Sequence, residues 1–114
     1  MGPLYVAIGL FGMAALFGMY MLSLILGGKS APRAAVITHG FFAALALIVL
    51  LVYITVHPPG PWASLTVFVL AAIGGLTMVY RFVIGKTVPK WLAIGHGLTA
   101  IVGFTLLILF AFAQ

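Results

Sequence analysis

The sequence predicts an all-α membrane protein, a four-helix up-down-up-down bundle built from two parallel helical-hairpin repeats. Three observations support this prediction. Hydrophobic residues make up 66% of the 114-residue chain and charged residues only 4%, far below the roughly one quarter typical of soluble domains. Four apolar runs each have about the 20 residues that a helix needs to cross a bilayer. A turn motif followed by a histidine occurs twice at a fixed spacing.

The repeat divides a single transmembrane domain into two copies, residues 1–57 and residues 58–114. The repeated segments are Gly28–Arg33 with His39-Gly40, and Gly85–Lys90 with His96-Gly97, at an offset of 57 positions (85 − 28). Each copy crosses the membrane twice, so both copies run in the same direction and should be related by a pseudo-two-fold axis along the membrane normal. This symmetry places the second and fourth helices on one diagonal of the bundle, with one repeated histidine on each.

Each predicted helix occupies one apolar run. The runs are Leu4–Leu26, Ala34–Val56, Ala63–Ile84 and Trp91–Phe112. The separators Gly27–Arg33, His57–Pro61 and Gly85–Lys90 all contain Pro or Gly and are short, so consecutive helices should be antiparallel neighbours. Pro32 and Pro89 suit the first turn of the helix that follows each of them, because the missing proline N–H has no helical partner there.

All five positive charges lie at one end of the predicted bundle. They are Lys29, Arg33, Arg81, Lys86 and Lys90. An excess of Lys and Arg marks the cytoplasmic side of a membrane, so both chain termini should be extracytoplasmic. We expect the chain to lie in the lipid bilayer of a bacterial inner membrane. This topology explains the net charge of +5, and no nucleic acid partner is expected.

The composition also excludes several kinds of chemistry. The chain contains no Asp or Glu, so it has no carboxylate proton relay, no carboxylate cage for Ca²⁺ or Mg²⁺, and no glycosidase acid–base pair. It contains no Cys, which excludes disulfide exchange, thiolate catalysis, iron–sulfur clusters and thioether-linked haem. Histidine is therefore the strongest ligating side chain that remains.

His39 and His96 are the strongest candidates for a binding site. Each lies seven residues beyond the proline of its turn, about 10 Å along a helix. The two side chains should therefore lie at equal depth in the hydrocarbon region, on diagonally opposed helices. An ionisable side chain at such a depth is by default a functional-site hypothesis. The alternative is that each histidine only hydrogen-bonds a neighbouring helix or a backbone carbonyl.

Haem b suits this histidine pair better than a bare metal ion does. Zinc sites usually have three or four protein ligands, and the third histidine, His57, is predicted to lie at the opposite membrane face. Haem iron needs only two axial ligands from the protein because the porphyrin fills the four equatorial positions, and imidazole is a common axial ligand. We therefore predict one haem b per chain, with His39 and His96 as its metal ligands.

Two glycines and one arginine complete the predicted site. Gly18 and Gly75 should lie about 12–14 Å from the cytoplasmic ends of their helices, level with the histidines, where the edges of a porphyrin need small residues. Ordinary packing of small residues between membrane helices is the alternative for both. Arg81 is predicted to donate a charge-assisted hydrogen bond to a haem propionate, or alternatively to snorkel to the headgroups. The other cations should serve mainly topology, and one or two of them could pair with propionates.

Four membrane helices with paired intramembrane histidines resemble the four-helix b-type cytochromes, the cytochrome b561-like group in the broad sense. The resemblance covers the helical architecture and the pair His39 and His96. It implies a non-covalent haem b and electron transfer involving quinol, a soluble carrier or an oxidant. The two-haem members have a second intramembrane histidine pair near the opposite face. This sequence lacks that pair, so the resemblance implies one haem near the cytoplasmic side.

The functional prediction is a membrane-bound b-type cytochrome that carries electrons. An electron carrier or a subunit of an oxidoreductase is favoured over a stand-alone enzyme. Its expected partners are quinol or a redox protein, with a homodimer or a larger membrane complex as possible assemblies. Two alternatives stay open. One is a membrane protein that handles or senses haem through a reversible ligand. The other is a small structural membrane subunit without a cofactor, in which the histidines only tie helices together.

Overall fold

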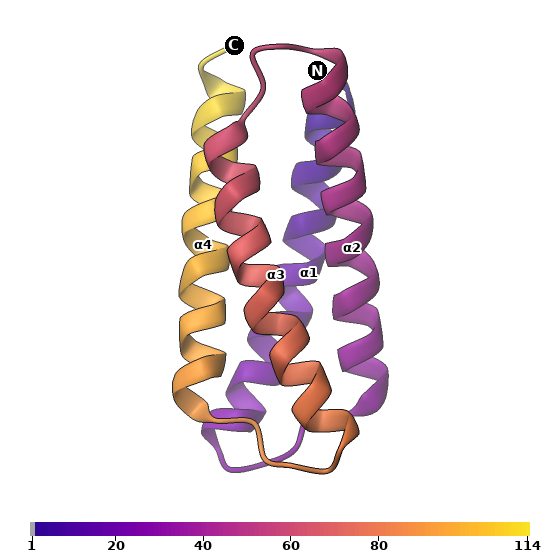
Figure 1. The fold of residues 1–114 in the computed structure, drawn as a ribbon, viewed down its shortest axis with the longest axis vertical. Helices are drawn as coiled ribbons and strands as arrows, with labels where there is room; N and C mark the ends of the chain where they lie inside the picture. Colours follow the sequence, from indigo (N-terminus) through magenta and orange to yellow (C-terminus); the bar gives the residue numbers. More distant parts are fainter. Residues whose placement is uncertain (1) are drawn as a thin grey trace.

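The computed structural model describes residues 2–114 and is a bundle of four helices (Figure 1). They are α1 (Gly2–Leu26), α2 (Arg33–Val56), α3 (Trp62–Val83) and α4 (Lys90–Phe112). Each is long and apolar enough to cross a membrane, and the bundle measures 42 Å along its longest axis. The predicted all-α fold is therefore confirmed, and every helix boundary lies within two residues of the predicted one.

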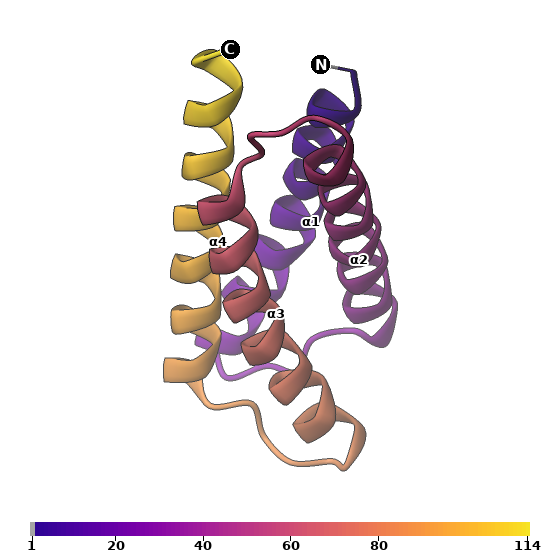
Figure 2. The same ribbon diagram turned by 45° about the horizontal axis from the view of Figure 1, so that its top comes forward.

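The helices follow one another around the bundle in chain order (Figures 1 and 2). Helix α1 packs against α2 and α4, and α3 packs against α4 and α2, whereas the backbones of the two diagonal pairs stay more than 8 Å apart at every Cα. Helices α2 and α4 therefore face each other across the bundle, as the repeat predicts. Both termini lie at one end, and the α1–α2 and α3–α4 loops lie at the other (Figure 1).

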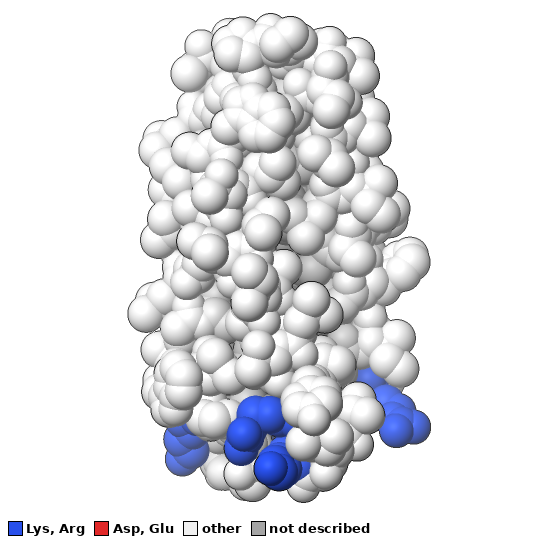
Figure 3. Space-filling view, viewed as in Figure 1, with Lys and Arg blue, Asp and Glu red and all other residues white. Residues whose placement is uncertain are grey.

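The surface of the bundle is apolar nearly all round. Large hydrophobic side chains point outward along every helix, including Leu76 (70% exposed), Trp91 (74%) and Phe112 (84%). Soluble monomers rarely expose contiguous apolar surface on this scale. The Lys and Arg side chains gather instead at the end that carries the α1–α2 and α3–α4 loops (Figure 3). The chain is thus an integral membrane protein whose charged residues lie at one edge of an apolar cylinder.

The α1 and α3 helices end in the same hydrogen-bonded turn. The backbone bonds are Gly28 N–H to Ile25 O (3.0 Å) and Lys29 N–H to Leu24 O (2.8 Å), with Gly85 N–H to Phe82 O (3.2 Å) and Lys86 N–H to Arg81 O (2.9 Å) as their equivalents. This crossed pair of bonds is the Schellman motif, which needs a left-handed residue just beyond the helix. Gly28 and Gly85 supply it, each with φ of +76°. The repeated glycines therefore set the direction in which both loops leave the membrane-spanning helices.

The repeated prolines lie one residue before their helices instead of within the first turn. Pro32 (φ −62°, ψ 140°) and Pro89 (φ −63°, ψ 135°) are the N-cap residues of α2 and α4, in an extended conformation. Their carbonyl oxygens accept the first helical bonds, from Val36 N–H and Ala93 N–H, each at 3.1 Å. The proline is compatible with either position, because neither requires its missing N–H.

Substitution of Gly28 by Ala should destabilise the protein. An L-residue in the left-handed region costs roughly 1–2 kcal/mol, so the thermal unfolding temperature of Gly28→Ala in detergent should fall. The neighbouring Gly27→Ala is the matched control, because its added Cβ would meet Ser23 O at 3.4 Å, an ordinary contact, and its φ is not positive. The second copy already carries a large side chain, Ile84, at that position. Equal losses of stability in both variants would contradict the argument.

The packed core lies in the half of the bundle near the chain termini. Its buried side chains are Leu4, Ala7, Phe11, Ala46, Leu50, Tyr53, Ile54, Phe68, Leu107 and Ala111. Phe11 and Phe68, which are equivalent in the repeat, stack on each other with ring centroids 3.8 Å apart and planes 2° apart. The buried Ser64 hydroxyl donates to Gly103 O at 2.8 Å in the same half. Large side chains therefore fill this half, which leaves the interior beyond the two phenylalanines to small residues.

Candidate functional site

A cavity of about 780 Å³ occupies the half of the bundle that ends in the basic loops. Phe11 and Phe68 border its inner end, and residues of both loops border its mouth. Much of its wall consists of equivalent residues from the two copies, including Ala14 and Ala71, Gly18 and Gly75, Met21 and Met78, Leu22 and Val79, His39 and His96, and Ala43 and Ala100. The wall is mostly apolar, and the two histidines are its only ionisable groups away from the mouth.

Each histidine is oriented by a hydrogen bond inside its own hairpin. His39 Nδ1 lies 2.7 Å from Ala14 O on α1, and His96 Nδ1 lies 2.7 Å from Ala71 O on α3. A carbonyl oxygen can only accept, so we assign the proton of each neutral ring to Nδ1. The lone pair of each ring then lies on Nε2, and the structure gives Nε2 of neither histidine a hydrogen-bond partner. Both rings thus keep one free nitrogen donor for a ligand in the cavity.

Gly18 and Gly75 allow the imidazoles to reach these carbonyl groups. Gly18 lies one helical turn beyond Ala14, and Gly75 lies one turn beyond Ala71, so each ring crosses over a glycine. A Cβ atom at Gly18 would meet His39 Cε1 at 3.1 Å, and one at Gly75 would meet His96 Cε1 at 3.0 Å. Such distances are too short for an undisturbed contact. The two glycines line the cavity at the depth expected, but their direct contact is with the histidine of their own copy.

The structure brings His39 and His96 together across the α2–α4 diagonal. Their ring centroids are 6.0 Å apart, and the ring planes are inclined by 76°. Two imidazoles on opposite sides of one metal ion need about 6.2 Å between ring centres, from about 2.0 Å per metal–nitrogen bond and about 1.1 Å from nitrogen to ring centre. The observed separation of the ring centres is close to this value, as two ligands of one ion would require.

No further His, Cys, Asp or Glu side chain joins this pair among the described residues. Within residues 2–114 there is no cluster of three or more His, Cys, Asp or Glu side chains. His57 follows α2 at the opposite end of the bundle, where its ring stacks on Tyr53 with centroids 4.8 Å apart. The arrangement offers two imidazole nitrogens in a mostly apolar cavity, and a metal held by these two alone would take its further ligands from the molecule that carries it.

Arg81 has a different position from the one that a direct role in cofactor binding requires. Its Nε–H donates to Thr87 O at 2.9 Å, across the α3–α4 loop, and Arg81 is not among the residues that border the cavity. Lys29, Lys86 and Lys90 do border it, at the mouth. Direct contact between Arg81 and a propionate therefore stays a prediction.

The carbonyl acceptors of Ala14 and Ala71 are the part of the site that sequence reasoning missed. A signal was nevertheless present, because each alanine lies 25 positions before its histidine (39 − 14 and 96 − 71) and four before its glycine. The Ala-x-x-x-Gly pattern that recurs in both copies is therefore the sequence feature that accompanies the two carbonyl acceptors.

Comparison with known proteins adds no further constraint to this site. No protein-family model, no curated protein and no solved structure matches the chain. The functional interpretation therefore depends on the geometry of the cavity and its two histidines, and on the chemistry that this geometry allows.

Proposed function

We propose that this chain is a membrane-bound b-type cytochrome that holds one haem b between His39 and His96 and carries electrons. The observation that supports this most strongly is the pair of free Nε2 donors on facing helices, with ring centroids 6.0 Å apart. Histidines that bind metals almost always donate their other ring N–H to a carbonyl, a carboxylate or water. His39 and His96 both do so, to Ala14 O and Ala71 O.

The cavity suits a porphyrin in size and polarity. Its volume of about 780 Å³ falls within the range of about 300–1,000 Å³ that ligand pockets usually have. Small residues from α1 and α3, including Ala14, Gly18 and their equivalents, border the cavity at the level of the histidine pair. The macrocycle supplies four equatorial nitrogens, so two imidazoles complete the coordination of the iron. The proposal therefore requires no carboxylate or thiolate, and the chain contains neither.

The residues of this chain favour electron transfer over oxygen activation. Haem b would supply one-electron redox chemistry, and His39 and His96, if both held its iron, would leave no open position for a substrate. The hydrogen bonds to Ala14 O and Ala71 O hold both rings in place through a change of charge at the metal. Phe11 and Phe68 close the inner end of the cavity, which keeps water from the site on that side.

The same proposal includes an orientation and a class of partner. The basic loops should face the cytoplasm and both termini the opposite side of a bacterial inner membrane, because Lys and Arg are enriched on cytoplasmic loops. The haem then lies nearer the cytoplasmic face. A quinol from the bilayer or a redox protein would exchange electrons with it, in a homodimer or as part of a larger complex.

One observation favours a second candidate, a structural membrane subunit without a cofactor. The bonds from His39 to Ala14 O and from His96 to Ala71 O fasten α2 to α1 and α4 to α3, so the histidines also tie helices together. This candidate explains the Nδ1 bonds but gives no role to the free Nε2 atoms or to the cavity between the rings.

The optical spectrum of the purified protein tests the proposal. Protein purified in detergent after expression with haem supplementation should show a sharp α-band of low-spin haem b on reduction with dithionite. The pyridine haemochrome assay should give about one haem b per chain. A folded protein that remains colourless under these conditions would exclude the cytochrome and leave the structural candidate. A reduced spectrum typical of five-coordinate haem would contradict ligation by both histidines.

A further inference from the structure

We propose that Lys86 binds a haem propionate at the mouth of the cavity and that Arg81 is its positioning residue; this inference rests on the proposed function. It assigns the acidic edge of the cofactor to the α3–α4 loop, and it distinguishes two lysines that occupy equivalent places in the repeat. Lys29 in the α1–α2 loop, the equivalent of Lys86, is expected to have no such role.

The polarity of the cavity determines which way an amphiphile must lie in it. Phe11 and Phe68 border the inner end, and every charged residue of the wall, Lys29, Lys86 and Lys90, lies at the mouth. The chain has no Asp or Glu, so no protein carboxylate competes for these ammonium groups. A flat, apolar molecule with two carboxylates on one edge is therefore bound most favourably with that edge at the mouth.

The distance from the histidines to the mouth is suitable for such an edge. His39 lies six residues after Arg33, and His96 six residues after Lys90, which is about 9 Å along each helix at 1.5 Å per residue. The lysine side chains extend several ångströms from the loops. A molecule centred between the two imidazoles can thus bring its acidic edge to the level at which the ammonium groups lie.

The two loops differ in one bond. Both helices end in the same Schellman turn, but in the second copy Arg81 also donates from Nε to Thr87 O at 2.9 Å. The residue equivalent to Arg81 in the first copy is Leu24, which has no donor. A charged donor makes a stronger hydrogen bond than a neutral one. Arg81 therefore holds the backbone at Thr87, the residue after Lys86, whereas the backbone after Lys29 has no equivalent hydrogen bond.

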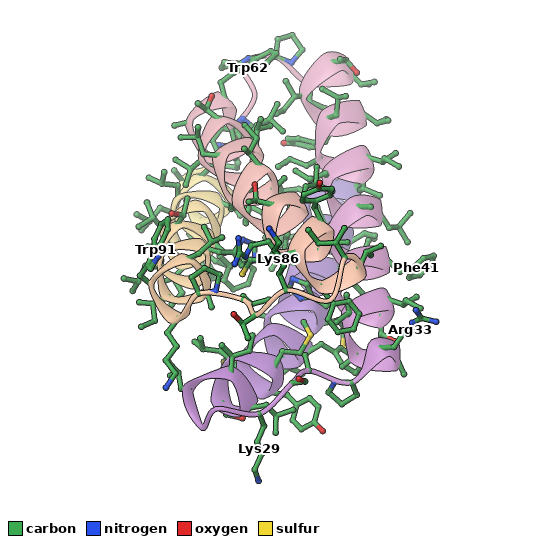
Figure 4. All side chains as sticks on the ribbon, turned by 60° about the horizontal axis from the view of Figure 1, so that its bottom comes forward. Lys29, Arg33, Phe41, Trp62, Lys86 and Trp91 are labelled. Carbon is green, nitrogen blue, oxygen red and sulfur yellow. The ribbon has the colours of Figure 1, made fainter. Side chains whose placement is uncertain are left out.

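The lysine side chains of the two loops also point in different directions. In the view toward the basic end, Lys86 extends across the middle of the bundle, whereas Lys29 and Arg33 point away from it (Figure 4). Lys86 also borders the cavity. Lys29 and Lys90 border it as well, so the direction of the Lys86 side chain and the bond from Arg81 to Thr87 O are what distinguish Lys86 from Lys29.

Comparison of haem b with its dimethyl ester tests this assignment, because the ester keeps the porphyrin and the iron but has no carboxylate charge. Apo-protein in detergent should bind haem b about five- to tenfold more tightly than the ester, as expected for one partly exposed charge-assisted hydrogen bond. Lys86→Gln should lower the affinity for haem b by about this factor and remove most of the difference between the two ligands. Arg81→Leu, which installs the residue of the first copy, should have a smaller effect in the same direction.

Three controls separate the proposed role from a general effect of charge. Lys29→Gln changes the equivalent lysine, and Arg33→Gln removes an outward-pointing charge; both should keep the difference between haem b and its ester. Lys86→Arg retains a cationic donor and should restore that difference, which a purely structural role of Lys86 would not predict. The α-band should remain in all of these variants, because none of them changes an iron ligand.

The outcomes distinguish this inference from the proposed function. Equal affinity of the wild-type protein for haem b and its ester overturns the role of Lys86 and leaves the cytochrome intact. The same conclusion follows if Lys29→Gln removes the difference between the ligands as fully as Lys86→Gln does. If the folded wild-type protein binds neither ligand, both the inference and the proposed function are overturned.

Discussion

Substitution of either cavity histidine is expected to abolish the α-band of low-spin haem b. His39→Ala and His96→Ala each remove one iron ligand, and the remaining imidazole cannot hold the iron in the six-coordinate state. Reduced-minus-oxidised spectra and haem content per chain should both fall to background or to a weak five-coordinate signal. Each variant also loses one hydrogen bond between helices, which in membrane proteins is worth on average about 0.6 kcal/mol, so the fold itself should persist.

Two comparisons make this result specific to the metal ligands. His57→Ala changes the histidine at the opposite end of the bundle and should leave the band unchanged. Added imidazole should partly restore the low-spin spectrum of His96→Ala, because the substitution leaves space for a free ligand beside the iron. A band that survives unchanged in either cavity variant would show that the iron is held elsewhere. If the wild-type protein shows no band and the cavity variants fail to fold, the structural candidate would be favoured.

The second large effect is expected at Gly75, which the ring of His96 crosses. A Cβ atom there would meet His96 Cε1 at 3.0 Å and Nδ1 at 3.5 Å. Gly75→Ala should therefore shift the ring by a few tenths of an ångström and lower haem affinity by about tenfold, since metal sites lose 10–100-fold when the group that orients a ligand is disturbed. Gly75→Val should remove haem binding entirely. Haem titration of the apo-protein measures both effects.

The neighbouring Gly74 offers a matched control for this prediction. A Cβ atom at Gly74 would lie 3.8 Å from His96 Cβ, an ordinary contact, so Gly74→Ala should bind haem as the wild-type protein does. Both alanine variants gain helix propensity of about 1 kcal/mol, so their stability should not fall. Equal haem affinity in the two variants would contradict the role assigned to Gly75.

The helices and their order around the bundle were predictable from the sequence because the bilayer imposes them. Apolar runs of bilayer-spanning length, interrupted by glycine and proline, leave few alternatives to antiparallel neighbours. The repeat then determined which helices face each other, and it placed His39 and His96 at the same depth. The alignment of two copies thus supplied long-range information that a single hairpin would not contain.

The details of the site were not predictable, because membrane helices are apolar on all sides. In a soluble bundle an amphipathic stripe shows which face points inward, whereas lipid-facing and core-facing residues here are equally hydrophobic. The depth of Gly18 could therefore be predicted, but not that it lies under the ring of its own copy. The partner of Arg81 depends on the path of the α3–α4 loop, which the sequence alone does not specify. The concentration of the packed core near the termini depends on which large side chains point inward.

The two hairpins orient their histidines separately, each without help from the other. Each hairpin orients its own imidazole through its own backbone, so one hairpin paired with an identical copy about a two-fold axis would present the same two donors. The stacking of Phe11 on its equivalent Phe68 is the self-contact that such an axis produces. Two separate hairpins of this kind would therefore offer the same pair of imidazole donors as the fused chain. In a fused chain the two halves can differ in sequence. One such difference is Arg81, whose equivalent in the first copy is Leu24.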